Sequence, residues 1–137
     1  MFLGYKCSLC GTEYAPDEVT YVCPKHGAPD SGVGNLDGRW DYDSIRRTAS
    51  PGSISASRDF SIWRYLPLLP VADPGFERTV LRAVGWTPFL SAPRLSTRLG
   101  LRHLWLKDDG RNPTASFKDR ASAVVVARAL EIGAGTT

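Results

Sequence analysis

The pattern of hydrophobic and polar positions is most regular near the end of the chain. From Phe117 onward, residues that share one helical face recur at steps of three and four: Ala121, Val124, Val125, Arg128 and Ile132. This spacing predicts an amphipathic helix of about four turns, ended by Gly133 and Gly135. Ser116 followed by Asp119 resembles a capping box at the start of that helix.

The segment before this helix has the pattern of an α/β unit. Residues 93–99 are predicted to form a short helix closed by Gly100. Residues 103–107 alternate in polarity and are predicted to form a strand, and residues 108–114 a loop. A strand, a loop and a capped helix begin an α/β unit, so we assign residues 71–137 to one α/β domain.

The first thirty residues show no helical period. Residues 12–14 and 19–22 are predicted to pair as a small hairpin through a turn at 15–18. A segment as short as residues 1–30 cannot bury a core of its own, so something else must hold it. Residues 31–70 contain a stretch at 48–57 with the composition of a linker. We interpret residues 31–70 as a segment that wraps over a larger body, with a plain surface loop as the alternative.

Composition changes this picture little. The chain has 137 residues, of which 42% are hydrophobic and 23% charged, as in an ordinary globular protein. No apolar stretch reaches the ~18 residues of a membrane span, and no secretory signal is visible. The net charge of +3 is spread among interleaved acidic and basic residues, which disfavours a nucleic-acid surface. We therefore expect a soluble, cytoplasmic protein without nucleic-acid or membrane partners.

All three cysteines lie near the start of the chain and have metal-ligand spacing. Cys7 and Cys10 form one pair with two residues between them, and Cys23 and His26 form a second. Two such pairs supply the four tetrahedral ligands of a closed structural zinc site, which predicts Zn²⁺ in a zinc-ribbon-like segment over residues 1–30. Three reduced cysteines beside a surface histidine are the alternative interpretation. The other histidine, His103, is interpreted as structural.

Lys118 is placed unusually for a surface lysine. It falls in the first turn of the predicted helix, where the partial positive charge of the helix N-terminus disfavours a cation. The same field favours the free amine that a nucleophile condensing with an aldehyde needs. Lysines of this kind form Schiff bases with pyridoxal phosphate. An ordinary exposed lysine on a helix is the alternative.

The sequence around Lys118 closely resembles the cofactor-lysine motif of threonine synthases, which are fold-type II pyridoxal-phosphate enzymes. The segment from Trp105 to Ala121 reads Trp-Leu-Lys-Asp-Asp-Gly-Arg-Asn-Pro-Thr-Ala-Ser-Phe-Lys-Asp-Arg-Ala. Residues 85–89, Gly-Trp-Thr-Pro-Phe, resemble the Gly-x-Thr-Pro-Leu segment of the superfamily. Residues 62–70, with Trp-Arg-Tyr and Leu-Leu-Pro, resemble a further threonine-synthase element, so the similarity covers nearly the whole chain.

This resemblance implies a function and the residues that carry it. Lys118 would be the catalytic and cofactor-binding lysine of an enzyme that converts O-phosphohomoserine and water to threonine and phosphate. Ser116 would be a substrate contact, with a plain helix cap as the alternative. Three positions depart from the family pattern: Ala115 replaces a common Gly, Phe89 a common Leu, and His26 the fourth cysteine of the usual ribbon.

The resemblance also predicts that the chain is an N-terminal fragment. No second parallel strand follows the lysine helix, and the family's other cofactor-binding elements lie downstream. We therefore expect the 137-residue chain alone to be inactive, and a homo-oligomer is conceivable only for the full-length enzyme. Cysteate synthase and a threonine-dehydratase-like lyase are close alternatives, and an inactive zinc-ribbon binding module is a more distant one.

Overall fold

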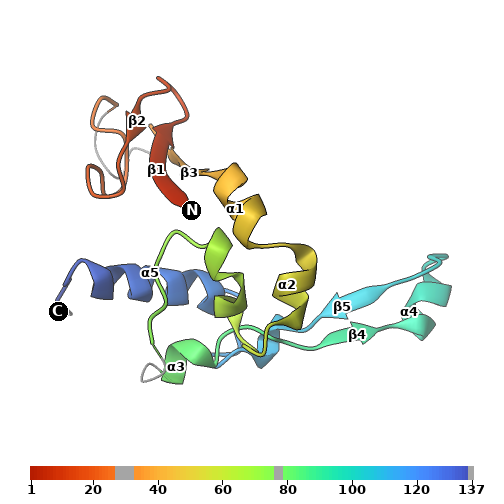
Figure 1. The fold of residues 1–137 in the computed structure, drawn as a ribbon. Coiled ribbons are helices and arrows are strands. Elements are labelled where there is room, and N and C mark those ends of the chain that lie inside the picture. Colours follow the sequence, from red (N-terminus) through yellow and green to blue (C-terminus); the bar gives the residue numbers. More distant parts are fainter. Residues whose placement is uncertain (27–32, 76–78, 136–137) are drawn as a thin grey trace. The chain divides into compact units, whose positions relative to one another are not determined.

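The computed structural model describes residues 1–26, 33–75 and 79–135, and it contains both helices and strands (Figure 1). The chain divides into two compact units, one of Met1–Ser55 with Pro67–Pro70 and one of Ala56–Leu66 with Val71–Thr137. The mixed content agrees with the predicted α/β class. The predicted boundary between residues 30 and 31 lies outside the described residues.

The first unit is built on an antiparallel sheet of three short strands in the order β2-β1-β3. The strands are β1 (Phe2–Cys7), β2 (Glu13–Tyr14) and β3 (Leu36–Trp40). Tyr5 of the central strand lies opposite Tyr14, and Cys7 lies opposite Leu36. The ring of Phe2 meets those of Tyr5 and Trp40 edge-on, with centroids 5.2 and 5.4 Å away. These aromatic contacts add apolar packing to this small sheet.

The predicted pairing of residues 12–14 with residues 19–22 is wrong. β2 forms at the expected place, but it pairs with β1, and residues 19–22 form no strand. The physical reason is that β1 offers β2 a longer strand with an aromatic pair directly opposite. Residues 19–22 instead lead into Cys23, whose N–H donates to the Gly34 carbonyl oxygen at 2.9 Å.

Two short helices follow the sheet, α1 (Tyr42–Thr48) and α2 (Pro51–Ala56). The Asp41 carboxylate caps α1 by accepting a hydrogen bond from the Ser44 N–H at 2.9 Å. The stretch with linker composition, residues 48–57, is therefore largely helical. Its Ser and Gly content reflects exposure, since α2 buries none of its residues.

The second unit contains residues 62–66 of the kinked 3₁₀ helix η1 (Ile62–Leu68) and, further along the chain, helix α3 (Thr79–Arg82). Trp63 is 3% exposed, and its indole N–H donates to the Leu81 carbonyl oxygen at 3.0 Å. Gly85 has φ +97°, and a Cβ there would lie 2.7 Å from the backbone nitrogen of Ile62. The close approach of these two segments therefore requires glycine at position 85.

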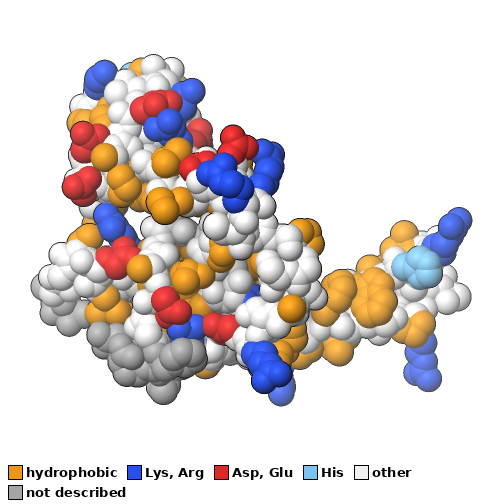
Figure 2. Space-filling model, in the orientation of Figure 1, with side chains coloured by type: hydrophobic (Ala, Val, Ile, Leu, Met, Phe, Trp, Pro, Cys, Tyr) orange, Lys and Arg blue, Asp and Glu red, His pale blue; other side chains and the backbone are white. Residues whose placement is uncertain are grey.

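Strands β4 (Phe89–Ser91) and β5 (Trp105–Lys107) pair as a two-stranded antiparallel hairpin. Helix α4 (Pro93–Arg98) lies in the connection between them. The helix predicted at 93–99 is confirmed, and the strand predicted at 103–107 forms over its last three residues. The exposed rings of Phe89 and Trp105 stack with centroids 5.2 Å apart. Hydrophobic side chains are visible along this hairpin in Figure 2.

The 3₁₀ turn η2 (Asp109–Arg111) leads to the long helix α5 (Asp119–Glu131). The predicted helix is confirmed, but its buried residues are Asp119, Ala123 and Ala127, whereas Ala121 and Val125 are exposed. The predicted face is therefore wrong, because two alanines let the helix pack closely while the larger valines point outward. Among the described residues, no helix has the length and apolarity to cross a membrane.

Candidate functional site

Lys118 lies at the N-cap position of α5, one residue before the helix begins. Its side chain is exposed, with Nζ 5.9 Å from the centre of the Phe117 ring. Its backbone N–H donates to the Ser116 hydroxyl oxygen at 3.1 Å. The amine is therefore accessible to an aldehyde, which is the first requirement for covalent attachment of pyridoxal phosphate.

The loop that presents Lys118 is closed by Asp119. This side chain is 8% exposed, and its carboxylate accepts hydrogen bonds from the N–H of Thr114, at 2.8 Å, and from the Thr114 hydroxyl. The predicted capping box is wrong for this reason: Asp119 binds Thr114 and does not reach back to Ser116. Ala115, between Thr114 and Ser116, has φ +58°. This left-handed conformation is energetically unfavourable for a residue with a Cβ.

The other end of the loop is anchored by Asn112, which is 5% exposed. Its side-chain oxygen accepts from the Gly85 N–H at 3.0 Å, and its amide donates to the Asp109 carbonyl oxygen at 3.0 Å. With Asp119 fixed at one end and Asn112 at the other, the segment that carries Lys118 has a defined path.

A charged network lies beside this loop. Arg120 Nη2 is 2.8 Å from Asp109 Oδ1 and 3.0 Å from the Thr87 hydroxyl, and Arg120 Nε is 3.2 Å from Asp109 Oδ2. The Thr87 hydroxyl also donates to Asp109 at 2.5 Å. Hydrogen bonds from Arg120 and then Thr87 lower the pKa of Asp109 to about 2. Asp109 and Thr87 are 22 residues apart and no local spacing links them, so only the fold reveals their contact.

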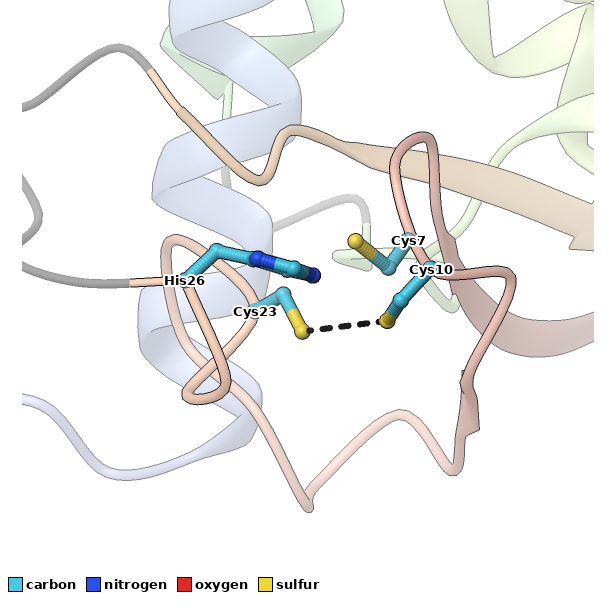
Figure 3. A group of neighbouring side chains, drawn as sticks. All are labelled: Cys7, Cys10, Cys23 and His26. Atoms are coloured by element: carbon cyan, nitrogen blue, oxygen red, sulfur yellow. Dashed lines mark hydrogen bonds between the residues drawn. The ribbon is translucent and has the colours of Figure 1, made fainter.

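Cys7, Cys10, Cys23 and His26 come together as the sequence predicts (Figure 3). One possible ligand atom from each residue lies within 4.8 Å of the others. The sulfurs of Cys10 and Cys23 are 3.9 Å apart. Two sulfurs bound to one tetrahedral zinc, each at ~2.3 Å, would be separated by about 3.8 Å. The cluster therefore has the dimensions of a four-ligand metal site.

The chemistry of the cluster also fits a metal. All three cysteines are free thiols, and Cys7 and Cys23 are buried. His26 Nε2 is buried and has no hydrogen-bond partner in the described part of the chain. A buried nitrogen without a partner is costly, and a bound cation would satisfy it.

Neighbouring groups support these ligands. Hydrogen bonds with the side chain and backbone of Thr12 lower the pKa of Cys10 to about 6, which favours the thiolate that binds metals. The Tyr14 hydroxyl lies 3.0 Å from Cys23 Sγ, and this contact raises the pKa of Tyr14 to about 12. Gly34 has φ +77°, and a Cβ there would lie 2.9 Å from the Cβ of His26.

Comparison with known proteins identifies the relatives of this chain. Residues 80–137 match the family model described as pyridoxal-phosphate dependent enzyme. The chain is 39% identical over 131 residues to the threonine synthase of Methanosarcina acetivorans, covering 96% of this chain and 29% of that protein. It is 37% identical over 128 residues to the threonine synthase of Methanocaldococcus jannaschii, covering 93% and 29%.

The chain is similar to threonine synthases over nearly its whole length. It spans 29% of the length of each of these two enzymes. A third threonine synthase, from Mycobacterium leprae, is 43% identical over 83 residues, which cover 61% of this chain and 20% of that protein. No solved structure matches the chain.

The residues around Lys118 all lie within the region that matches the enzyme family. The structure places Ser116, Lys118 and Asp119 on one short loop within the region that matches the enzyme family. It places the four predicted metal ligands in the other unit.

Proposed function

We propose that Lys118 is the cofactor-binding and catalytic lysine of a threonine synthase that converts O-phosphohomoserine and water to L-threonine and phosphate. The observation that carries the proposal is an exposed lysine at the start of α5, on a loop fixed at both ends, within a region that matches pyridoxal-phosphate dependent enzymes. The names of the relatives, both threonine synthases, support threonine as the product. A cytoplasmic location belongs to the same proposal.

The roles of the side chains follow from this position. Pyridoxal phosphate, when bound, supplies an electron sink next to the substrate α-carbon. Lys118 Nζ would hold the cofactor, and the same amine would move protons at the substrate α- and β-carbons. In the overall reaction phosphate leaves the γ-carbon, which gains a proton, and water supplies the hydroxyl group at the β-carbon. Asp119 holds the loop that carries Lys118 through its hydrogen bonds to Thr114.

Ser116 is proposed as a substrate contact. Its hydroxyl oxygen accepts the backbone N–H of Lys118, so it already has a local structural role. The hydroxyl hydrogen is still able to donate to an anionic group of the substrate. If Ser116→Ala raises the KM for O-phosphohomoserine without lowering the melting temperature, the contact is supported. A lower melting temperature with an unchanged KM would assign Ser116 to the helix start alone.

The lysine assignment is tested in the intact protein with added pyridoxal phosphate. We expect a visible absorbance band that is lost in Lys118→Ala and kept in the matched control Lys6→Ala, which removes an exposed lysine of the other unit. Borohydride treatment followed by peptide mapping should place the reduced cofactor on Lys118. A band that survives Lys118→Ala, or a label on another lysine, would refute the assignment.

Product analysis separates threonine synthase from its alternatives. Because the 137 residues alone are expected to be inactive, the assay uses a full-length protein that contains them. With O-phosphohomoserine we expect threonine and phosphate in equal amounts. Formation of 2-oxobutyrate from threonine would instead indicate a dehydratase, and formation of cysteate from sulfite would indicate cysteate synthase. Absence of all three reactions, with the cofactor attached to Lys118, would exclude this set of enzymes.

We also propose that Cys7, Cys10, Cys23 and His26 bind one structural Zn²⁺. The dimensions of the cluster, the unpartnered His26 nitrogen and the lowered pKa of Cys10 support this choice. Four protein ligands leave no open position on a tetrahedral ion, so the site would have a structural and not a catalytic role. A binding module with zinc alone remains the second candidate function, because this cluster needs no residue of the other unit.

The zinc site is tested by metal analysis of purified protein. We expect about one zinc per chain, since four ligands hold a single ion. His26→Ala and Cys23→Ser should lower the zinc content, whereas His103→Ala, which removes an exposed histidine of the other unit, should leave it unchanged. Clearly less than one zinc in the unaltered protein, or equal loss in both histidine variants, would contradict the site.

A further inference from the structure

The three cysteines of the metal cluster differ in their access to solvent. Cys23 is 0% and Cys7 2% exposed, so both are buried, whereas Cys10 is exposed. Cys10 lies in a turn over residues 8–10, and its neighbours Ser8 and Leu9 are exposed as well. A reagent that arrives from solvent therefore meets the sulfur of Cys10 before either of the other two.

A second sulfur lies beside this exposed one. Cys10 Sγ is 3.9 Å from Cys23 Sγ, and Figure 3 shows the two sulfurs facing each other. A disulfide bond has a length of ~2.05 Å, so the two sulfurs need to approach by about 1.9 Å to form one. Cysteines that react with oxidants are commonly exposed and placed next to a second cysteine that closes the disulfide. Cys10 and Cys23 have this arrangement.

The backbone at Cys10 is better able to make this movement than the backbone at Cys7. Cys7 is the last residue of strand β1 and lies opposite Leu36 in the sheet. Cys10 belongs to no strand or helix, and it is followed by Gly11, a residue type with wide conformational freedom. We therefore expect the turn to carry Cys10 to Cys23, while the sheet holds Cys7 in place.

Polar groups beside Cys10 also suit an oxidation at its sulfur. The Thr12 hydroxyl lies 3.1 Å from Cys10 Sγ, and the same hydroxyl oxygen accepts a hydrogen bond from Lys25 Nζ at 2.9 Å. Because Lys25 donates to this oxygen, the hydroxyl hydrogen of Thr12 is able to point at the sulfur. A donor and a cation near the sulfur stabilise the negative charge that develops on a departing hydroxide.

We propose that Cys10 is a site of oxidation by hydroperoxides, that Cys23 then closes a disulfide with it, and that zinc is released. The Cys10 thiolate attacks one oxygen of hydrogen peroxide, the O–O bond breaks, and hydroxide leaves as a sulfenic acid forms on Cys10. The Cys23 thiolate attacks the same sulfur, the S–O bond breaks, and a second hydroxide leaves. The two thiolates lose two electrons in total, and the peroxide gains them.

The release of zinc rests on the zinc site proposed above, whereas the disulfide requires only the positions of the two sulfurs. Once Cys10 and Cys23 are joined, only Cys7 and His26 remain as ligands from the cluster. Two ligands do not complete a tetrahedral site, so the ion dissociates. The step is reversible, because a thiol reductant converts the disulfide back to the two thiols that zinc needs.

Hydrogen peroxide treatment of the intact, zinc-loaded chain tests the proposal. A chromogenic chelator should detect about one zinc released for each disulfide formed. Peptide mapping without reduction should find Cys10 joined to Cys23, with Cys7 still open to alkylation. Dithiothreitol with added zinc should restore the starting zinc content. Ser8→Ala changes an exposed side chain of the same turn and removes no thiol, so this matched control should release zinc as the parent does.

The variant Cys10→His keeps a side chain that binds zinc but has no thiol at the exposed position. It should release zinc at least about tenfold more slowly than the parent in peroxide. If this variant does not take up zinc, the peptide map of the parent provides the result.

The outcomes separate this inference from the zinc site itself. A Cys10–Cys23 disulfide in a chain that binds no zinc would support the oxidation site and refute the zinc site. Zinc that is bound at the start and kept through the treatment would overturn the inference and leave the zinc site standing. A disulfide between Cys7 and Cys10, or equal release from Cys10→His and the parent, would overturn it as well.

Discussion

Asp109 is the residue on which most of the polar contacts beside the lysine loop converge. Its carboxylate accepts from Arg120 and Thr87, and its backbone oxygen accepts from Asn112. Thr87 and Arg120, which are 33 residues apart in sequence, therefore meet at one short side chain. Loss of the charge on Asp109 should affect both contacts together.

The lowered pKa of Asp109 predicts how stability depends on pH. Its folded-state pKa, about 2, lies below its ordinary value of 3.8. The ionised carboxylate therefore stabilises the fold at pH above 3.8, and this contribution is lost as the pH falls from 3.8 towards 2. Urea unfolding between pH 5 and 2 should show a decline in the parent protein that is smaller in Asp109→Asn. Parallel curves for the two proteins would contradict the prediction.

At the scale of elements, α5 shows how a correct periodicity can indicate the wrong face. Its valines and alanines are all apolar, so a three- and four-residue pattern can be drawn along more than one side of the helix. The structure buries the alanines: Ala123 is 2% and Ala127 3% exposed, whereas Val125 is 66% exposed. Small side chains at these positions set how closely the helix approaches its neighbours.

Enlarging a buried alanine of α5 should therefore destabilise the second unit. Ala127→Leu forces extra volume into a packed contact, and we expect a loss of about 1–3 kcal/mol in the free energy of unfolding. Val125→Leu is the matched change at an exposed position of the same helix and should shift it by less than about 0.5 kcal/mol. Urea denaturation measures both, and similar losses in the two variants would show that Ala127 is not closely packed.

The sequence indicated local features well and long-range contacts poorly. The spacing of Cys7, Cys10, Cys23 and His26 predicted their convergence, because each pair is brought together by a short turn. The apolar periodicity from Phe117 onward predicted the start of α5 to within two residues. The network of Thr87, Asp109 and Arg120 spans 33 residues of sequence and depends on packing that no local spacing records.

At the scale of the molecule, the two units are stabilised by different means. The second unit buries apolar residues around Trp63, Leu81 and Val84, whereas the first has a short three-stranded sheet and the cysteine–histidine cluster. Small domains with little core commonly depend on a metal or disulfides. The proposed zinc would therefore matter most to residues near the sheet.

Removal of metal should affect the first unit selectively. With a strong chelator, we expect hydrogen exchange at amides of β1 to accelerate by at least about tenfold, since the ligand Cys7 ends that strand. Amides of α5 serve as the internal reference and should exchange at nearly unchanged rates. Added zinc should restore the protection of β1. Equal acceleration in β1 and α5, or no change in either, would contradict the selective effect.

The order of the metal ligands along the chain also bears on how the sheet is made. β1 and β3 are far apart in sequence, and their pairing places Cys7 opposite Leu36. All four ligands, in contrast, lie between residues 7 and 26. During synthesis the ligands therefore emerge before β3 does. An ion bound at that moment would already shorten the free loop between β1 and β3. It would thereby lower the entropic cost of closing that loop when β3 pairs with β1. In cells, the rate at which this unit folds would then depend on the supply of zinc while the chain is still being made.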